Sequence, residues 1–323
     1  MRRPRRRRWA AGAGLAALAL LALILAACGQ GGGQAASGAS EGAGEAAGRL
    51  PEEEEAPAAS PEPQELLECL YYEENGFFKA DAAEAYDAGG ELRAATSPHF
   101  LPCMDYTAGV LKTVAAQGGC DTVFVVAPNH SGQGFPVTLS PLSWNTPFGV
   151  LETDREAVAA ILGDSSLRGL AGEDAGRLEA DHSASVQTPF IKCYLPDAKV
   201  VALLVGKGAA PETLDRLAEH IRGLGEDRRV FLLCSVDFSH YEPIEKVAGH
   251  DAETEAALLA GDAEALLAFG NEHMDSPQAL RVFLRYGAAL AEGAPRKLDG
   301  RVLPESEMSR AVGYSYYVYG WVG

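Results

Sequence analysis

The stretch "TVFVVAPNHSGQG" (Thr122–Gly134) carries the signal that decides the fold. Four consecutive apolar residues run into a proline, an asparagine and His130, so a buried strand is predicted to end where a polar loop begins. An apolar run without alternation is typical of a strand that is covered on both faces, as in parallel and mixed sheets. The stretch therefore predicts a strand inside an α/β domain, with a histidine at its carboxyl end.

Two other segments have the same character, "KVVALLV" (Lys199–Val205) and "RVFLLCSV" (Arg229–Val236), and "ELRAAT" (Glu91–Thr96) is a weaker candidate strand. The Tyr-rich "VGYSYYVYGWVG" that ends the chain predicts a closing strand. Apolar residues recur at helical spacing in 154–162, 211–225, 250–261, 262–270 and 276–293. This alternation predicts a single α/β domain, with a central mostly parallel or mixed sheet flanked by helices.

The first 28 residues predict a targeting segment. Six arginines precede an almost uninterrupted apolar run, and "LAAC" closes it at Cys28. The segment resembles the bacterial lipoprotein signal, which implies a signal peptide over 1–28 and lipidation of Cys28. An uncleaved membrane anchor is the alternative. In both cases the rest of the chain is expected outside the cytoplasm, held to the cell membrane.

Residues 29–65 are rich in Gly, Ala, Glu and Pro and predict a disordered tether, which leaves 66–323 as the folded domain. Removal of the arginine-rich signal would move the formal charge from −18 to −24, which argues against a nucleic-acid partner. The five cysteines beyond Cys28 show no repeated spacing, so they predict neither a disulfide framework nor a zinc knuckle. A single disulfide remains open.

The histidines follow the predicted strands. His99, His130 and His240 each come just after a strand, and His182 lies in "EADHSAS", which could fold over the same edge. One such histidine is usually a loop residue, but three at equivalent strand ends favour a shared crevice, where ligands bind in α/β sheets. Imidazole clusters suit Zn, Fe or Cu. Asp237, in "DFSH", either caps a turn or orients a histidine.

The segments "SPHF", "APNHSG", "EADHSASVQTPF", "SVDFSHY" and "AVGYSYYVYG" resemble, in order and approximate spacing, the motifs of the Memo-like family, the B component of the AmmeMemoRadiSam set. The resemblance covers most of the chain from Gln64 on. It implies a fold like that of the class III extradiol dioxygenases, whose site holds non-heme iron on two histidines and a carboxylate.

By this resemblance, His99 and His130 are the metal ligands and His240 is the acid/base residue. Asp237 lies beside His240, and His182 lines the pocket. Memo-like proteins usually supply a cysteine as third ligand, but the matching segment here is "EHMDSPQAL". Asp275 is favoured at that position because it restores a two-His-one-carboxylate face, and His273 is the alternative. Asp275 or Ser276 could also simply cap the helix that begins at Pro277.

These patterns favour an exported, membrane-tethered Memo-like protein that binds a divalent metal, most readily Fe(II), with Cu or Zn as alternatives. It would act as an oxidoreductase on a small molecule that the sequence does not identify. Two rival hypotheses are a non-catalytic lipoprotein that captures a metal or ligand, and a zinc hydrolase that uses the same histidines.

Overall fold

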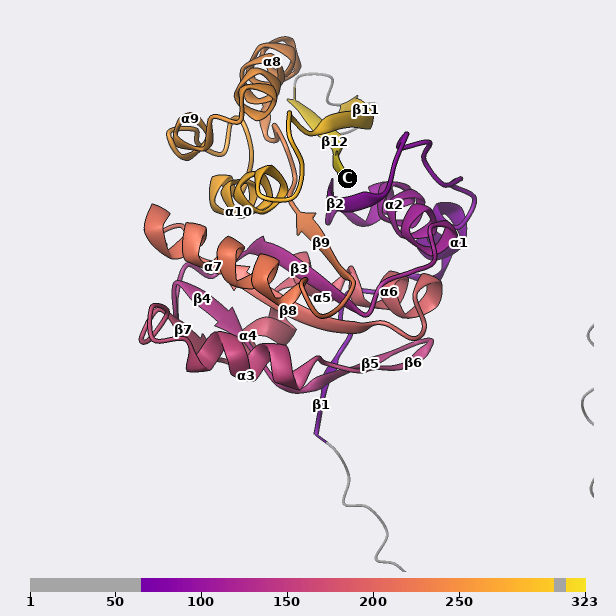
Figure 1. Cartoon of the computed structure of the whole chain (residues 1–323). Coiled ribbons are helices and arrows are strands. Elements are labelled where there is room, and N and C mark those ends of the chain that lie inside the picture. The colour runs from indigo at the N-terminus through magenta and orange to yellow at the C-terminus, as the bar shows by residue number, and fades with distance from the viewer. Residues whose placement is uncertain (1–64, 305–311) are drawn as a thin grey trace, which may run out of the picture. The chain divides into compact units, whose positions relative to one another are not determined.

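The computed structural model describes residues 65–304 and 312–323 (Figure 1). The predicted signal peptide, the predicted lipidation site Cys28 and residues 29–64 of the predicted tether lie outside the described residues. Among the described helices, none is both long and apolar enough to cross a membrane.

A mixed nine-stranded sheet forms the centre of the described domain, and three short strands form a second sheet in the order β1-β5-β6. The large sheet runs β10-β12-β2-β9-β3-β8-β4-β7, with β11 paired to β12. The four central strands β2, β9, β3 and β8 are mutually parallel, whereas β12 and β4 are antiparallel to their inner neighbours. The strands are β1 (Leu66–Glu68), β2 (Leu92–Ser97), β3 (Thr122–Pro128), β4 (Val137–Leu139), β5 (Ser143–Thr146), β6 (Gly149–Leu151), β7 (Ala171–Glu173), β8 (Lys199–Val205), β9 (Val230–Ser235), β10 (Glu242–Pro243), β11 (Arg296–Pro304) and β12 (Val312–Val322).

The predicted fold class is confirmed, and all five predicted helical regions contain helices. The structure adds helices that the sequence patterns did not predict, chiefly α2 and the short α4, α5 and α6. The helices are α1 (Glu74–Ala80), η1 (Leu101–Cys103), α2 (Asp105–Ala116), α3 (Arg155–Gly163), α4 (Ala175–Ala180), α5 (His182–Ser185), α6 (Thr188–Tyr194), α7 (Pro211–Leu224), α8 (Ile244–Ala260), α9 (Ala263–Leu267) and α10 (Pro277–Ala288).

Helices cover both faces of the large sheet, as the continuous apolar strands require. Along β3, Phe124 and Val126 point into one core and Val123 and Val125 into the other. The first core is closed by α3, α7, α9 and α10, and the second by α1, α2, α5 and α6. In Figure 1, α7 and α10 accordingly lie on one side of β3 and β9, and α2 and α6 on the other.

The sheet order places three polar loops side by side. Strand β9 inserts between β2 and β3, so the parallel strands β2, β9 and β3 end next to one another. His99 follows β2, Asp237 follows β9 and His130 follows β3. In parallel sheets this carboxyl edge is where ligands bind.

Helix α10 reaches the sheet through a close contact at Gly287. A Cβ atom there would overlap the indole ring of Trp321 on β12, well inside van der Waals distance. Gly249 is also helical, on α8, but a Cβ there would meet nothing within 4 Å.

We predict opposite effects for alanine at these two helical glycines. Gly287→Ala should lower the free energy of unfolding by about 1–3 kcal/mol, because α10 must move away from Trp321. Gly249→Ala should raise it by up to about 1 kcal/mol, because alanine restricts the unfolded chain and favours helix. Urea unfolding followed by circular dichroism measures both. A stable Gly287→Ala protein would contradict the close α10–β12 packing.

Candidate metal centre

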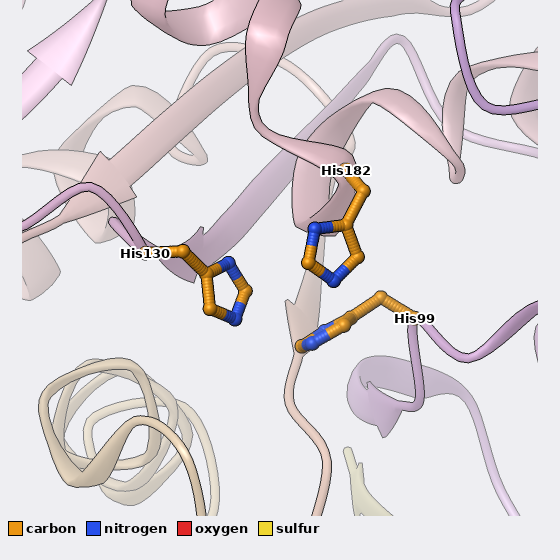
Figure 2. A group of neighbouring side chains, drawn as sticks. All are labelled: His99, His130 and His182. Carbon is orange, nitrogen blue, oxygen red and sulfur yellow. The ribbon is translucent and has the colours of Figure 1, made fainter.

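Three imidazoles converge at the carboxyl edge of the sheet from three separate segments (Figure 2). One ring nitrogen of each of His99, His130 and His182 lies within 4.8 Å of those of the other two, as a shared metal ion requires. The rings of His130 and His182 stack with centroids 4.5 Å apart. The rings of His99 and His130 are nearly perpendicular, with centroids 5.3 Å apart.

Hydrogen bonds fix which nitrogen of His99 faces the centre of the cluster. The Ser235 hydroxyl donates its single proton to the carbonyl of Ser183 at 2.6 Å, and Gln187 Nε2 donates to the Ser235 oxygen at 3.1 Å. The Ser235 oxygen can therefore only accept from His99 Nδ1, which lies 3.2 Å away. With its proton held at Nδ1, His99 has only Nε2 left for a metal.

His130 is oriented by a carboxylate. Its Nδ1 donates to Asp181 Oδ1 at 2.9 Å, and its backbone N–H donates to Asp181 Oδ2 at 2.9 Å. The same carboxylate accepts from the Ser183 backbone as the N-cap of α5. In the structure it both caps α5 and leaves Nε2 of His130 for a ligand.

Asp275 lies between the two imidazoles. Its Oδ2 is 2.9 Å from His99 Nε2 and 3.7 Å from His130 Nε2. Both of its oxygens are buried, and apart from these two imidazoles neither has a hydrogen-bond partner among the described residues. Two atoms bound to one metal at about 2.1 Å are roughly 3.0 Å apart at right angles and roughly 3.4 Å apart in a tetrahedron. The two spacings are close to those values, so the residues present fit a divalent metal.

The alternative third ligand, His273, lies elsewhere. Its Nε2 is 2.8 Å from Glu253 on α8, and its ring stacks on Phe269 with centroids 4.1 Å apart. The N-cap of α10 is Ser276, whose hydroxyl oxygen accepts a hydrogen bond from the backbone N–H of Ala279. The Asp275 carboxylate is therefore not used to cap α10 and faces the imidazoles instead.

The centre thus offers two ligand sets that share His99 and His130. Asp275 completes a two-His-one-carboxylate face, whereas His182 completes a three-imidazole face. The sequence placed His182 only as a residue lining the pocket. In the structure, His182 lies in the first turn of α5 with its ring stacked on that of His130, so it is a further candidate metal ligand.

Charges within the centre separate the protonation states of the three histidines. Burial lowers the pKa of His130, but its hydrogen bond to Asp181 and the nearby Asp275 outweigh burial and raise the pKa to about 10. For His99, the charges of Asp237 and Asp275 likewise outweigh burial and raise the pKa. Burial, reinforced by these two imidazoles, lowers the pKa of His182 to about 4. The two imidazoles that contact carboxylates therefore have raised pKa values, whereas His182 is neutral at pH 7.

The "DFSH" turn after β9 contributes two residues with different partners. Asp237 Oδ1 accepts the backbone N–H of His99 at 3.0 Å, so it positions the first histidine. The Nδ1 of His240 is oriented instead by the carbonyl of Phe238, 2.7 Å away. The histidine that Asp237 positions is therefore His99, whereas a backbone carbonyl orients His240.

A cavity of about 660 Å³ opens onto the centre. Its polar floor contains His99, His182, Asp237 and His240. Its walls are mainly aromatic, with side chains from the loop after β2, from the β9–β10 turn and from β12. Ligands of such sites are usually buried against apolar walls and oriented by a few polar groups.

Sequence reasoning missed two contributors to this site. Ser235 sets the tautomer of His99, and its only signal was a serine at the end of an otherwise apolar strand. The aromatic wall includes Tyr314 and Tyr316, whose alternating motif was interpreted only as a closing strand.

Comparison with known proteins identifies the family. The sequence pattern of the family described as Memo-like protein matches residues 77–290, which is most of the folded domain. The chain belongs to the Memo-like family. A MEMO1 family protein of Pyrobaculum aerophilum is 29% identical over 61% of this chain and 68% of that protein. One from Methanopyrus kandleri is 26% identical over 81% of this chain and 95% of that protein.

Other Memo-like relatives match over a shorter length. One from Methanococcoides burtonii is 35% identical over 44% of this chain, and the match spans about half of that relative, 53%. Among solved structures, an uncharacterized Escherichia coli K12 protein aligns with a TM-score of 0.44 at 12% identity, over 72% of this chain and all of that chain.

We predict that metal binding by this Memo-like protein releases protons. Because the pKa of His130 lies at about 10, this imidazole must lose a proton before a metal can bind, and the raised pKa of His99 acts in the same direction. Below the pKa of His130, apparent zinc affinity should rise about tenfold per pH unit for each proton displaced. Calorimetry between pH 6 and 8, in buffers of different ionisation enthalpy, counts the protons. An affinity that does not depend on pH would contradict the arrangement.

Proposed function

We propose that this chain is a membrane-tethered, extracytoplasmic Memo-like metalloprotein that binds one divalent metal through His99, His130 and Asp275. The metal we favour is Fe(II), and the reaction class is oxidation of a small molecule. The observation that carries the proposal is the buried Asp275 carboxylate, which lies against two imidazole Nε2 atoms and has no other hydrogen-bond partner among the described residues. Two imidazoles and one carboxylate form the facial ligand set that leaves open positions on non-heme iron.

The protein side of this chemistry follows from the residues around the cavity. A bound iron would supply a Lewis acid and a redox centre. The floor residue His240 has its Nδ1 held by the Phe238 carbonyl, so Nε2 is the nitrogen that can exchange a proton with a substrate in the cavity. Asp237 holds the backbone of His99, and the aromatic walls give a substrate apolar surface beside the reacting groups.

A second candidate function rests on His182. Its neutral imidazole, close to His99 and His130, would complete a three-histidine zinc site of the kind that activates water for hydrolysis. A closed site with all positions filled would instead favour a non-catalytic binder. Measurable turnover of a substrate would distinguish an enzyme from a non-catalytic binding protein. The metal found after native purification would distinguish an iron oxidoreductase from a zinc hydrolase.

We predict that the third ligand can be identified by variants of neighbouring residues. Asp275→Ala should weaken anaerobic Fe(II) binding by at least about tenfold, because it removes the anionic ligand. His273→Ala, on the same loop, is the matched control. It should lower stability by loss of the Glu253 contact but leave metal affinity unchanged.

Calorimetry and metal analysis of the two variants and His182→Ala measure the effect. If His182→Ala abolished binding while Asp275→Ala preserved it, the three-histidine site would replace the proposed one. If wild-type protein bound no stoichiometric Fe, Cu or Zn, the metalloprotein proposal would be lost.

The proposed location rests on the sequence of the first 28 residues. Lipidation at Cys28 predicts that the wild-type chain partitions into the detergent phase of Triton X-114 with the mass of a diacylglycerol-modified protein. Cys28→Ser should lose this modification and keep its signal segment, because the lipidation site is absent. Mass spectrometry of both proteins, expressed in a bacterial host, is the measurement. An unmodified wild-type chain that retains residues 1–27 would support the uncleaved anchor instead.

A further inference from the structure

The cavity above the metal centre contains an aromatic corner, formed by Phe100, Tyr241, Tyr314 and Tyr316. Phe100 stacks nearly parallel to Tyr316, with ring centroids 5.4 Å apart, and to Tyr314, with centroids 6.3 Å apart. Tyr241 meets Tyr314 at 68°, with centroids 5.2 Å apart. Because Phe100 is nearly parallel to Tyr314, its plane is also steeply inclined to that of Tyr241, and two exposed rings inclined in this way can offer π faces to an organic cation.

The charges around this cavity also favour a cation. Among the described residues that line it, none is lysine or arginine, and the one carboxylate is Asp237. The chain as a whole carries a formal charge of −18. The Asp237 carboxylate and the aromatic rings favour a cation in this cavity, and the long-range field of the acidic chain attracts one.

Tyr241 is held in its position at a conformational cost. It is the one non-glycine residue with positive φ in the described chain, at 58°, and its side chain is 72% exposed. Bulky residues rarely adopt this left-handed conformation, and such strain is found at ligand sites more often than elsewhere. Neither burial nor a core contact explains a tyrosine here.

The strained turn is fixed on both sides. Before Tyr241, the hydroxyl of Ser239 donates to the buried carboxylate of Asp251 at 2.8 Å, and the backbone N–H of Ser315 donates to the Ser239 carbonyl at 2.7 Å. After it, β10 pairs with β12. These contacts hold the Tyr241 ring against His240, with centroids 5.2 Å apart, and against Tyr314.

We propose that the aromatic corner binds an organic cation, a substituted or quaternary ammonium group, and that the remainder of that molecule extends towards the imidazoles. The proposal gives a substrate class for the candidate metal centre. It rests on the proposed function in one respect, which is that the substrate of that centre binds in this cavity. The corner itself requires no metal, because its rings and charges belong to the chain.

The test compares choline with 3,3-dimethylbutan-1-ol, which has the same shape without the charge. Calorimetric titration of the purified protein, both metal-free and loaded with zinc, should give at least about tenfold tighter binding of choline. Equal binding of the two compounds, or preference for the neutral one, would overturn the proposal. If zinc failed to bind while the preference for choline persisted, the metalloprotein proposal would fail and the cation site would stand.

Tyr241→Asn separates a ligand role from a structural one. Asparagine tolerates positive φ, so the urea midpoint should stay the same or rise, while choline affinity should fall at least fivefold. The matched control is Phe148→Leu, an exposed aromatic residue that packs on Phe77 and does not line this cavity. It should leave choline binding unchanged. Unchanged choline affinity in Tyr241→Asn would overturn the assignment of the corner.

Discussion

The insertion of β9 between β2 and β3 is the constraint on which the site depends. The chain makes β2 and β3 first and adds β9 more than a hundred residues later, in parallel register with both. Only this pairing brings the loops with His99, His130 and Asp237 to adjacent strand ends. The central strands are apolar on both faces, so their pairing is stabilised by two cores at once, and the polar loops are confined to the edge.

The centre pairs its imidazoles with buried carboxylates, so that each imidazole offsets the cost of burying the carboxylate that it contacts. His99 is almost fully buried between Asp237 and Asp275, and His130 lies between Asp181 and Asp275. Each imidazole is oriented through Nδ1 by a group that belongs to another element, a serine on β9 or the N-cap of α5. The Nε2 atoms therefore point at one place without any side chain being free to turn, which is the preorganisation that a metal site requires.

The two sides of the cavity have different chemistry, and the turn after β9 links them. Its first residue, Asp237, supports the imidazole floor, and its last, Tyr241, contributes to the aromatic wall. Asp251 on α8 fixes that turn through Ser239 and also receives the hydroxyls of Ser315 and Tyr317 on β12. Helix α8 thus fixes the middle of the turn that joins the imidazole floor to the aromatic wall.

The sequence by itself determined where the central strands lie and which polar residues follow them. Apolar runs marked β3, β8 and β9, and His99, His130 and His240 could be placed after strands because hydrophobic patterning is local in the chain. Strand order could not be predicted in this way, since it depends on packing between distant segments. Only the tertiary structure brought Asp275 rather than His273 to the imidazoles, placed His182 over His130 and gave Ser235 its role. Each of these depends on contacts between residues about fifty or more positions apart, which no local pattern encodes.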